Sequence, residues 1–264
     1  MINKRLTDAQ YSKVRNIRKR KLSSFLYPFF LLLSKILNLS YDFFLLNLRQ
    51  KNPKVYSIQV SDQEIYETIQ IEGNLRKFDR SGVASDWLDR LNPIAKDIKK
   101  RNPTASHIRK KLLGVCMGAR NGSEVLAFES LLNEDYEVNV IGTDISPSAE
   151  TIKKMIVHDF HKPLPIECGA MDFIYSNSLD QANNPRLVLK SWLHSLSLTG
   201  TIYLEMTRGH GKQTTSLLDP FSCEIELFPY VFLQWDMDGY IEKTVYPNPN
   251  NSTRAIFVIK SSAT

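Results

Sequence analysis

The sequence predicts an α/β fold built on a mostly parallel sheet, and two observations support this prediction. Residues 112–144 show the pattern strand, turn, helix and strand, and both strands are short apolar runs of the kind that is covered on both faces. Near the end of the chain, the strand-like runs 241–246 and 254–260 flank a segment rich in proline and asparagine, which is typical of a hairpin. We therefore expect a parallel sheet that is completed by an antiparallel hairpin.

A turn with two glycines joins the first strand to the helix. The apolar run Leu112–Cys116 is followed by Gly118–Gly122, where the glycines allow the backbone to turn sharply and to approach a ligand closely. Ser123 and Glu124 then begin a helix with apolar residues at helical spacing. A helix that begins at the carboxyl end of a parallel strand directs its free N–H groups toward the crevice in which such sheets bind ligands.

The second strand, residues 138–143, ends at Asp144. A carboxylate at this position can accept hydrogen bonds from the two hydroxyl groups of a ribose, as in dinucleotide-binding folds. A buried strand, helix and strand unit without any ligand would show the same apolar pattern, so this alternative stays open.

The following segment continues the alternation of strands and helices. The expected elements are a short helix capped by Ser146 and Pro147, a strand Met155–His158, a strand Met171–Ser176, a helix from Pro185 to Leu198 and a strand Thr201–Met206. The polar loop after Thr207 contains Arg208, His210 and Lys212, and it is either a substrate loop or a plain surface connection.

From about Lys111 to Lys260 the sequence resembles the class I S-adenosylmethionine-dependent methyltransferases. The resemblance implies a Rossmann-like sheet of seven strands with a C-terminal antiparallel hairpin, and S-adenosyl-L-methionine as the cofactor. In that family a glycine-rich turn contacts the methionine part of the cofactor, an acidic residue after the second strand holds the ribose, and another after the third strand contacts the adenine. Asp144 and Asp159 match the two acidic positions.

Gly118 and Gly122 match the glycine-rich turn, whereas Cys116 and Arg120 stand where the family usually has two further glycines. The Gly-x-Gly-x-x-Gly pattern of dinucleotide oxidoreductases is not found at this turn. The cofactor-binding residues that the resemblance implies are Cys116, Gly118, Arg120, Gly122, Asp144, Ile145, His158, Asp159, Phe160, Asn177 and Ser178.

The resemblance implies transfer of a methyl group, and the basic, apolar N-terminal segment favours a small-molecule, glycan or lipid-type acceptor. Enzymes that methylate amino groups of nucleic-acid bases or of glutamine typically have Asn or Asp followed by Pro-Pro-Tyr, but here Asn177 is followed by Ser178 and Leu179. No catalytic residue is identified, and the candidates for a base are Asp180, Glu205 and His210. Two alternatives remain: a methyltransferase-like binding protein without catalysis, and a nucleotide-binding enzyme on a related fold.

Composition and charge narrow the class of partners. The chain has 264 residues and a net charge of +6. The first 21 residues carry +7, which leaves about −1 for the rest of the chain, so the predicted domain is not basic. The basic segment Lys96–Arg101 lacks interleaved aromatic residues, which disfavours nucleic acid as a partner. Three isolated cysteines suit a reducing compartment such as the cytoplasm, and no cluster with the spacing of metal ligands is present.

The chain divides into three expected regions: a basic and apolar helical extension (1–50), a helical cap or linker region (51–105) and the methyltransferase-like domain (106–264). We expect residues 49–110 to form helical pieces that are interrupted at Pro53, Gly73, Gly82, Pro93 and Pro103. The segment around Trp87 either caps the crevice or packs as an ordinary helix. Residues 22–48 have three open interpretations: helices packed on the core, a helix in the membrane interface, or a single span. The second implies peripheral contact of residues 10–48 with the inner face of a membrane.

Overall fold

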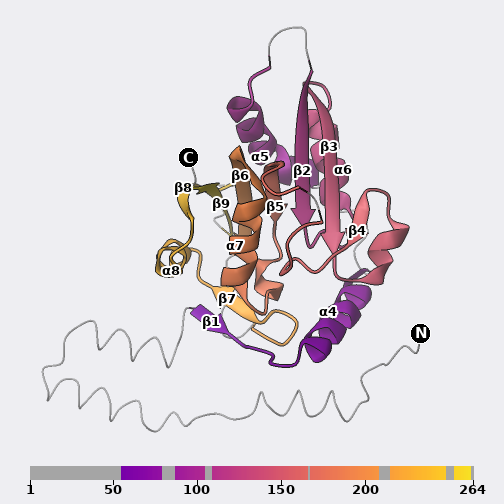
Figure 1. The fold of residues 1–264 in the computed structure, drawn as a ribbon, viewed down its shortest axis with the longest axis vertical. Helices are drawn as coiled ribbons and strands as arrows, with labels where there is room; N and C mark the ends of the chain where they lie inside the picture. Colours follow the sequence, from indigo (N-terminus) through magenta and orange to yellow (C-terminus); the bar gives the residue numbers. More distant parts are fainter. Residues whose placement is uncertain are drawn as a thin grey trace, which may run out of the picture.

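A mixed sheet of seven strands forms the centre of the described part of the protein (Figure 1). The structure, a computed structural model, describes residues 55–78, 87–104, 109–165, 167–207, 215–247 and 253–262. In spatial order the strands are β4 (Met155–Val157), β3 (Tyr136–Asp144), β2 (Lys110–Met117), β5 (Met171–Ser176), β6 (Leu196–Thr207), β9 (Arg254–Ser261) and β8 (Gly239–Val245). The first five are parallel to one another, and β9 runs antiparallel to both β6 and β8.

The register of the parallel strands brings three chain segments together at one edge of the sheet. Met117, the last residue of β2, is paired with Thr143 of β3 on one side and with Ser176 of β5 on the other. The residues that follow these positions, Gly118, Asp144 and Asn177, are therefore neighbours at the carboxyl ends of the strands.

Helices cover both faces of the sheet (Figure 1). On one face, α5 (Trp87–Arg101) and α6 (Ser123–Leu132) bury an apolar cluster against the sheet, with Ile94 and Phe128 among its members. On the other face, α7 (Pro185–Ser195) and α8 (Phe228–Gln234) contribute to a second cluster. Because both faces are covered, the central strands are apolar on both sides, as expected for parallel strands.

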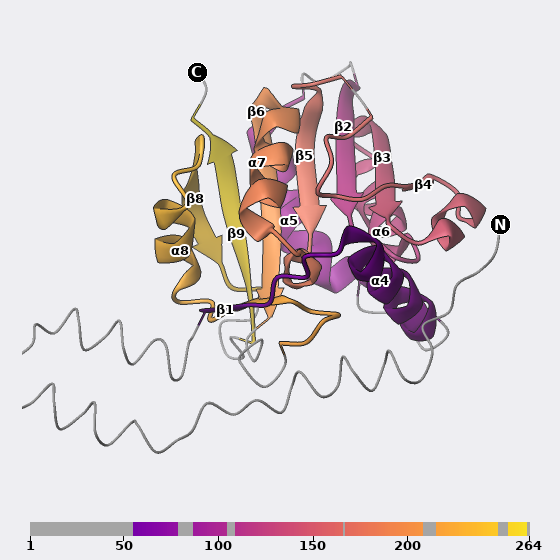
Figure 2. The same ribbon diagram turned by 60° about the horizontal axis from the view of Figure 1, so that its bottom comes forward.

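One further helix lies across the carboxyl edge of the sheet instead of on a face. Helix α4 (Gln63–Phe78) passes the ends of β2 and β3 (Figure 2). At the same edge, β1 (Val55–Ser57) pairs in antiparallel direction with β7 (Phe221–Cys223). Two short 3₁₀ helices follow strand ends there: η1 (Pro147–Thr151) follows β3, and η2 (Leu179–Gln181) follows β5.

Several predicted elements are confirmed. The strand, turn, helix and strand of residues 112–144 become β2, α6 and β3, and the C-terminal hairpin is β8 and β9. The predicted cap is also present: the side chain of Ser146 accepts a hydrogen bond from the backbone N–H of Ser148, Pro147 is the first residue of η1, and this helix is short.

Other boundaries were wrong. Helix α7 ends at Ser195 rather than at Leu198, because Leu196 has extended backbone angles and already pairs with Met171 of β5. Strand β4 ends at Val157, one residue before the predicted end. Strands β1 and β7 were not predicted, since a run of three residues is too short to show a period.

Gly73 and Pro93 do not break helices as expected. Gly73 lies within α4, and Pro93 lies within α5, where Leu91 and Ile94 are buried in the core. Burial of an apolar helix face can offset the local cost of a proline, which is roughly 3 kcal/mol.

The region expected to cap the crevice has two roles. Helix α5 packs on the sheet, and Leu91 belongs to the same apolar cluster as Leu112 of β2. The helix at the crevice is α4.

Residues 1–50 lie outside the described residues, so the three-region division and the interpretations of residues 10–48 stay predictions. None of the helices in the described ranges has the length and apolar character needed to span a membrane.

Candidate functional site

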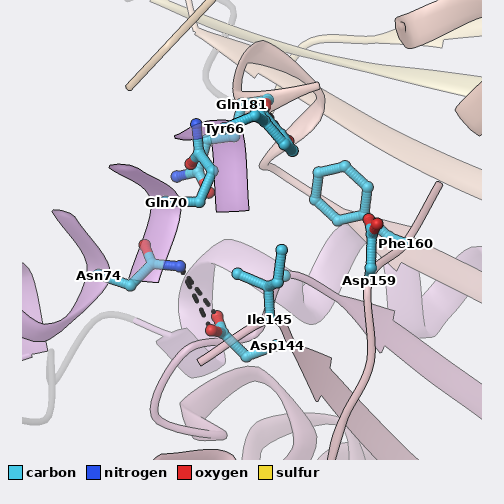
Figure 3. Close-up of a pocket in the computed structure, with 9 residues that line it drawn as sticks. Tyr66, Gln70, Asn74, Asp144, Ile145, Asp159, Phe160 and Gln181 are labelled. Atoms are coloured by element: carbon cyan, nitrogen blue, oxygen red, sulfur yellow. Dashed lines mark hydrogen bonds between the residues drawn. The ribbon is translucent and has the colours of Figure 1, made fainter. Parts of the chain in front are cut away.

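A cavity of about 260 Å³, counting the space open to solvent, lies between α4 and the carboxyl ends of β2, β3 and β4. Figure 3 shows that the side chains around it come from both sides, with Asn74 on α4 facing Asp144. The lining residues are Tyr66, Gln70, Asn74, Gly118, Asp144, Ile145, Asp159, Phe160 and Gln181.

The turn after β2 has a backbone conformation that suits glycine. Gly118 and Gly122 both have φ of 71°, in the left-handed region, and Arg120 between them has φ of 42°. The N–H of Ala119 donates to the carbonyl oxygen of Thr143 over 2.8 Å, which ties the turn to the end of β3. The turn therefore leaves the backbone of Gly118 at the wall of the cavity.

Asp144 is held by its neighbours at the tip of β3. Its Oδ1 accepts from the backbone N–H of Ser146 over 2.8 Å, and its Oδ2 accepts from the backbone N–H of Arg120 over 3.1 Å. Burial raises the pKa of Asp144, although the two backbone hydrogen bonds and the charge of Arg120 oppose this rise. The carboxylate is thus oriented by the backbone and has further lone pairs to accept from other donors.

Asp159 is held by His161. Its Oδ1 accepts from the backbone N–H of His161 over 3.0 Å and from the Nδ1 of that ring over 2.7 Å. The ring Nε2 lies 3.1 Å from the backbone N–H of Asn183, which can only donate, so Nε2 is unprotonated and Nδ1 carries the proton. Burial alone would raise the pKa of Asp159, but the hydrogen bonds from His161 outweigh it and the pKa is lowered.

Phe160 supplies an aromatic wall next to these carboxylates. Its ring packs edge-on against Trp192, with ring centres 6.0 Å apart, and its carbonyl oxygen accepts from the indole N–H of Trp192 over 3.3 Å. This packing fixes the ring beside Asp159 (Figure 3).

The structure brings five of the eleven predicted cofactor residues into the cavity wall: Gly118, Asp144, Ile145, Asp159 and Phe160. Cys116 is buried in the apolar cluster beneath α5 and α6, and burial raises the pKa of its thiol well above the usual value. Gly122 is also buried, and Arg120 contributes its backbone N–H, which donates to Asp144. The Nε2 of His158 lies 3.2 Å from the carbonyl oxygen of Lys162.

Ser178 contacts the glycine turn, since its hydroxyl donates to the carbonyl oxygen of Gly118 over 3.2 Å. Asn177 lines a second cavity instead.

Four residues in the wall of the first cavity were not predicted: Tyr66, Gln70, Asn74 and Gln181. The first three recur every fourth residue on the buried side of α4, so a polar repeat at helical spacing was the signal that could have indicated them.

The second cavity, of about 320 Å³ including open space, lies at the ends of β5 and β6. Its wall combines apolar and polar groups, and the lining residues are Asn177, Leu179, Asp180, Glu205, Met206, Thr207, Phe221, Ser222 and Cys223. Burial raises the pKa of Cys223 to about 12, so this thiol is neutral at ordinary pH. Residues 177–181 separate the two cavities, which therefore share one wall segment.

Glu205 is the most strongly engaged carboxylate of the second cavity. Its side chain is fully buried, Arg90 of α5 donates to both of its oxygens over 2.9 and 3.0 Å, and the hydroxyl of Tyr175 donates to Oε2 over 3.0 Å. Arg254 lies 3.7 Å away. His210, the third candidate base besides Asp180 and Glu205, lies outside the described residues.

The residues that the structure describes contain no group of three or more His, Cys, Asp or Glu side chains placed to hold a metal ion.

Comparison with known proteins supports the architecture. No protein-family model matches the sequence, and no curated protein matches it either. Among solved structures, the citrinin polyketide synthase CMeT domain matches with a TM-score of 0.53 and 15% identity, over 71% of this chain and 56% of that chain. A chain from the complex that contains the Haloferax volcanii Trm112 methyltransferase activator matches with a TM-score of 0.51 and 16% identity, over 77% and 99% of the two chains.

A third match, the cyclase SpnF, has a TM-score of 0.50 and 11% identity, over 78% of this chain and 98% of that chain. At such identities the likeness concerns the fold. The strand order with five parallel strands and an antiparallel C-terminal pair, together with these matches, shows that the protein has the class I methyltransferase fold.

Proposed function

We propose that the protein is an S-adenosylmethionine-dependent methyltransferase. The observation that carries the proposal is the meeting of Asp144, Asp159 and Phe160 on one cavity at the carboxyl edge of the sheet. The three side chains offer a carboxylate for a ribose diol, a carboxylate for an exocyclic amine and an aromatic face for a base. The backbone of Gly118 lies at the cavity wall, where we place the rest of the cofactor.

The residues present fit the nucleoside part of this cofactor. Asp144 has both oxygens in an acceptor role and is aimed at the cavity, while Oδ1 of Asp159 is held by His161 and Oδ2 accepts a longer hydrogen bond, of 3.5 Å, from Gln63. Arg120, which stands where the family usually has glycine, is not part of the cavity wall.

When bound, the cofactor would supply a methyl group that its sulfonium charge already activates. The chain would then mainly position the two reactants, an effect that can contribute about 7 to 11 kcal/mol. Asp144 and Asp159 would hold the nucleoside, and the second cavity would hold the acceptor beside residues 177–181, which border both cavities.

The second cavity supports a small-molecule acceptor, or the end of a glycan or lipid-type molecule. The wall of this cavity combines Leu179, Met206 and Phe221 with polar groups, which is the mixed character of a small-molecule site. Glu205 is bound by Arg90 and Tyr175. Asp180 lines the same cavity and is the side chain that we propose to orient the acceptor or to accept its proton.

Calorimetry with S-adenosylhomocysteine tests the cofactor part of the proposal. We expect the wild type to bind, and Asp144→Ala to bind at least 10-fold more weakly, because a hydrogen bond to a charged group contributes roughly 1.5 to 3 kcal/mol. Glu137→Ala, at an exposed position of the same strand, serves as the matched control and should bind like the wild type. No binding by the wild type at high protein concentration would contradict the proposal.

Transfer is tested separately from binding. Incubation with cofactor labelled in its methyl group and extracted small molecules or lipids should label a product, and comparison of metabolites with and without the gene would identify it. Binding without any label transfer would favour a protein that holds the nucleoside without methylation. The likeness to the cyclase SpnF gives this second candidate a specific basis, since the same fold there carries a different reaction.

A further inference from the structure

Helix α4 presents a buried polar stripe to the cofactor cavity. Tyr66, Gln70 and Asn74 recur every fourth residue and are only 1%, 3% and 5% exposed. The buried side of a helix is usually apolar, and buried polar groups cost free energy unless they are hydrogen-bonded. The stripe therefore predicts that α4 bonds to polar groups on the sheet edge.

The first contacts of α4 are with the two carboxylates of the proposed nucleoside site. The Nδ2 of Asn74 donates to Asp144 and lies 3.3 Å from Oδ1 and 3.5 Å from Oδ2 (Figure 3). Near the other end of the helix, the Nε2 of Gln63 donates to Oδ2 of Asp159 over 3.5 Å. Two amide groups on one helix thus occupy acceptor positions on both carboxylates.

A second set of contacts docks the helix on the neighbouring loops. The hydroxyl of Tyr66 donates to the carbonyl oxygen of Gln181 over 2.8 Å, and the Nε2 of Gln70 donates to that of Leu218 over 3.0 Å. Gly73 packs so closely on Leu218 that a Cβ atom would lie 2.0 Å from the leucine side chain. Helix α4 is therefore seated on the edge rather than resting loosely on it.

The docked helix leaves little room for the cofactor. The cavity beneath it reaches about 260 Å³ only when the space open to solvent is counted, so its enclosed part is smaller. The hydroxyl groups of a ribose would also need the oxygens of Asp144 that now accept from Asn74. Helix α4 in this position and the bound nucleoside compete for space and for hydrogen bonds.

We propose that α4 is a latch: Asn74 and Gln63 close the nucleoside site by bonding to Asp144 and Asp159, and the cofactor must displace these amides to enter. The inference rests on the proposed function. Only the fraction of molecules with an open latch binds, so the apparent dissociation constant is the intrinsic one divided by that fraction. The lengths of 3.3 to 3.5 Å are long for hydrogen bonds, which suits contacts that open in each binding event.

The latch is tested with Asn74→Ala and the matched control Leu75→Ala, which changes an exposed neighbour on the same helix. We expect Asn74→Ala to bind S-adenosylhomocysteine about 2- to 10-fold more tightly than the wild type, the factor that corresponds to one ordinary hydrogen bond. Without ligand, hydrogen exchange of residues 63–75 should be faster in Asn74→Ala than in the wild type and Leu75→Ala. Ligand should speed this exchange in the wild type.

The outcomes separate the latch from the proposed function. If S-adenosylhomocysteine binds the wild type while Asn74→Ala binds equally well or more weakly, Asn74 is a bystander or a direct ligand contact, and the latch is wrong although the site stands. Slower exchange of residues 63–75 with ligand would also overturn the latch, because the helix would then close on the cofactor. If neither the wild type nor Asn74→Ala binds, the proposed function fails and the latch with it.

Discussion

Gly118 is the residue at which backbone conformation and side-chain space restrict the sequence together. It has a left-handed φ of 71°, and a Cβ atom there would lie 2.8 Å from the Cβ of Ser178. Gly169 also has a left-handed φ, of 75°, but a Cβ atom there would meet nothing closer than 3.7 Å. Comparison of Gly118 with Gly169 therefore separates the cost of the left-handed backbone from the cost of the close contact with Ser178.

We expect Gly169→Ala to lower the free energy of unfolding by about 1 to 2 kcal/mol, the cost of the left-handed conformation for a residue with a Cβ atom. Gly118→Ala should cost a further 1 to 3 kcal/mol or so, because the overpacked contact with Ser178 must shift. Urea denaturation of the two variants measures both quantities. Equal losses would show that the Gly118 turn moves freely and does not depend on the contact with Ser178.

At the scale of elements, a buried ion pair joins helix α5 to strand β6. Arg90 donates to both oxygens of Glu205, which is fully buried, although 115 positions separate the two residues in the chain. The guanidinium of Arg90 also lies 4.1 Å from the centre of the Trp87 ring. Removal of one partner of such a pair leaves an uncompensated buried charge.

We expect Arg90→Met, which keeps an apolar stem, to lower the free energy of unfolding by about 3 to 5 kcal/mol, toward the lower value because Arg254 stays 3.7 Å from Glu205. Lys96→Met on the exposed side of the same helix is the control and should change stability by less than about 0.5 kcal/mol. Denaturant titration followed by circular dichroism gives both values. A loss below 1 kcal/mol for Arg90→Met would mean that the pair contributes little to the docking of α5.

At the scale of the whole molecule, one buried acid links global stability to pH. Glu124, in the first turn of α6, is 5% exposed, and its Oε2 has no hydrogen-bond partner among the residues that the structure describes. Burial raises its pKa to about 7, above the usual 4.5, although Arg90 and Arg120 oppose the rise. The folded state therefore binds this proton more tightly than the unfolded state, and its stability falls as pH rises from about 4.5 through 7.

We expect Glu124→Gln to match the wild type near pH 5 and to be more stable at pH 8, by up to roughly 3 kcal/mol, because the amide removes the buried charge. The difference between the two proteins isolates this residue, since all other titrating groups are shared. Glu134→Gln, on the exposed turn after α6, is the control for the loss of a carboxylate. Urea denaturation at both pH values would contradict the expectation if the difference did not grow with pH.

Local sequence patterns were sufficient to indicate one part of the fold. The apolar runs of β2 and β3, the glycine turn and the position of Asp144 at a strand tip follow from the period of side chains and from backbone freedom at glycine. These features lie within one strand, turn, helix and strand unit, so neighbouring residues are sufficient to indicate them. The resemblance to the methyltransferase family implied that Asp144 and Asp159 serve one site, and both residues line the same cavity.

The segments that complete the site from distant parts of the chain could be identified only in the folded structure. Asn74 lies 70 positions before Asp144, and Gln63 lies 96 positions before Asp159, and no local period indicates such pairs. In the same way, the tertiary structure showed that Arg90 binds Glu205. Glu205, which the sequence offered as a candidate base, is therefore one partner of an ion pair. The physical reason is that a contact between remote residues depends on the path of the whole chain, whereas side-chain periodicity reports only the surroundings of one element.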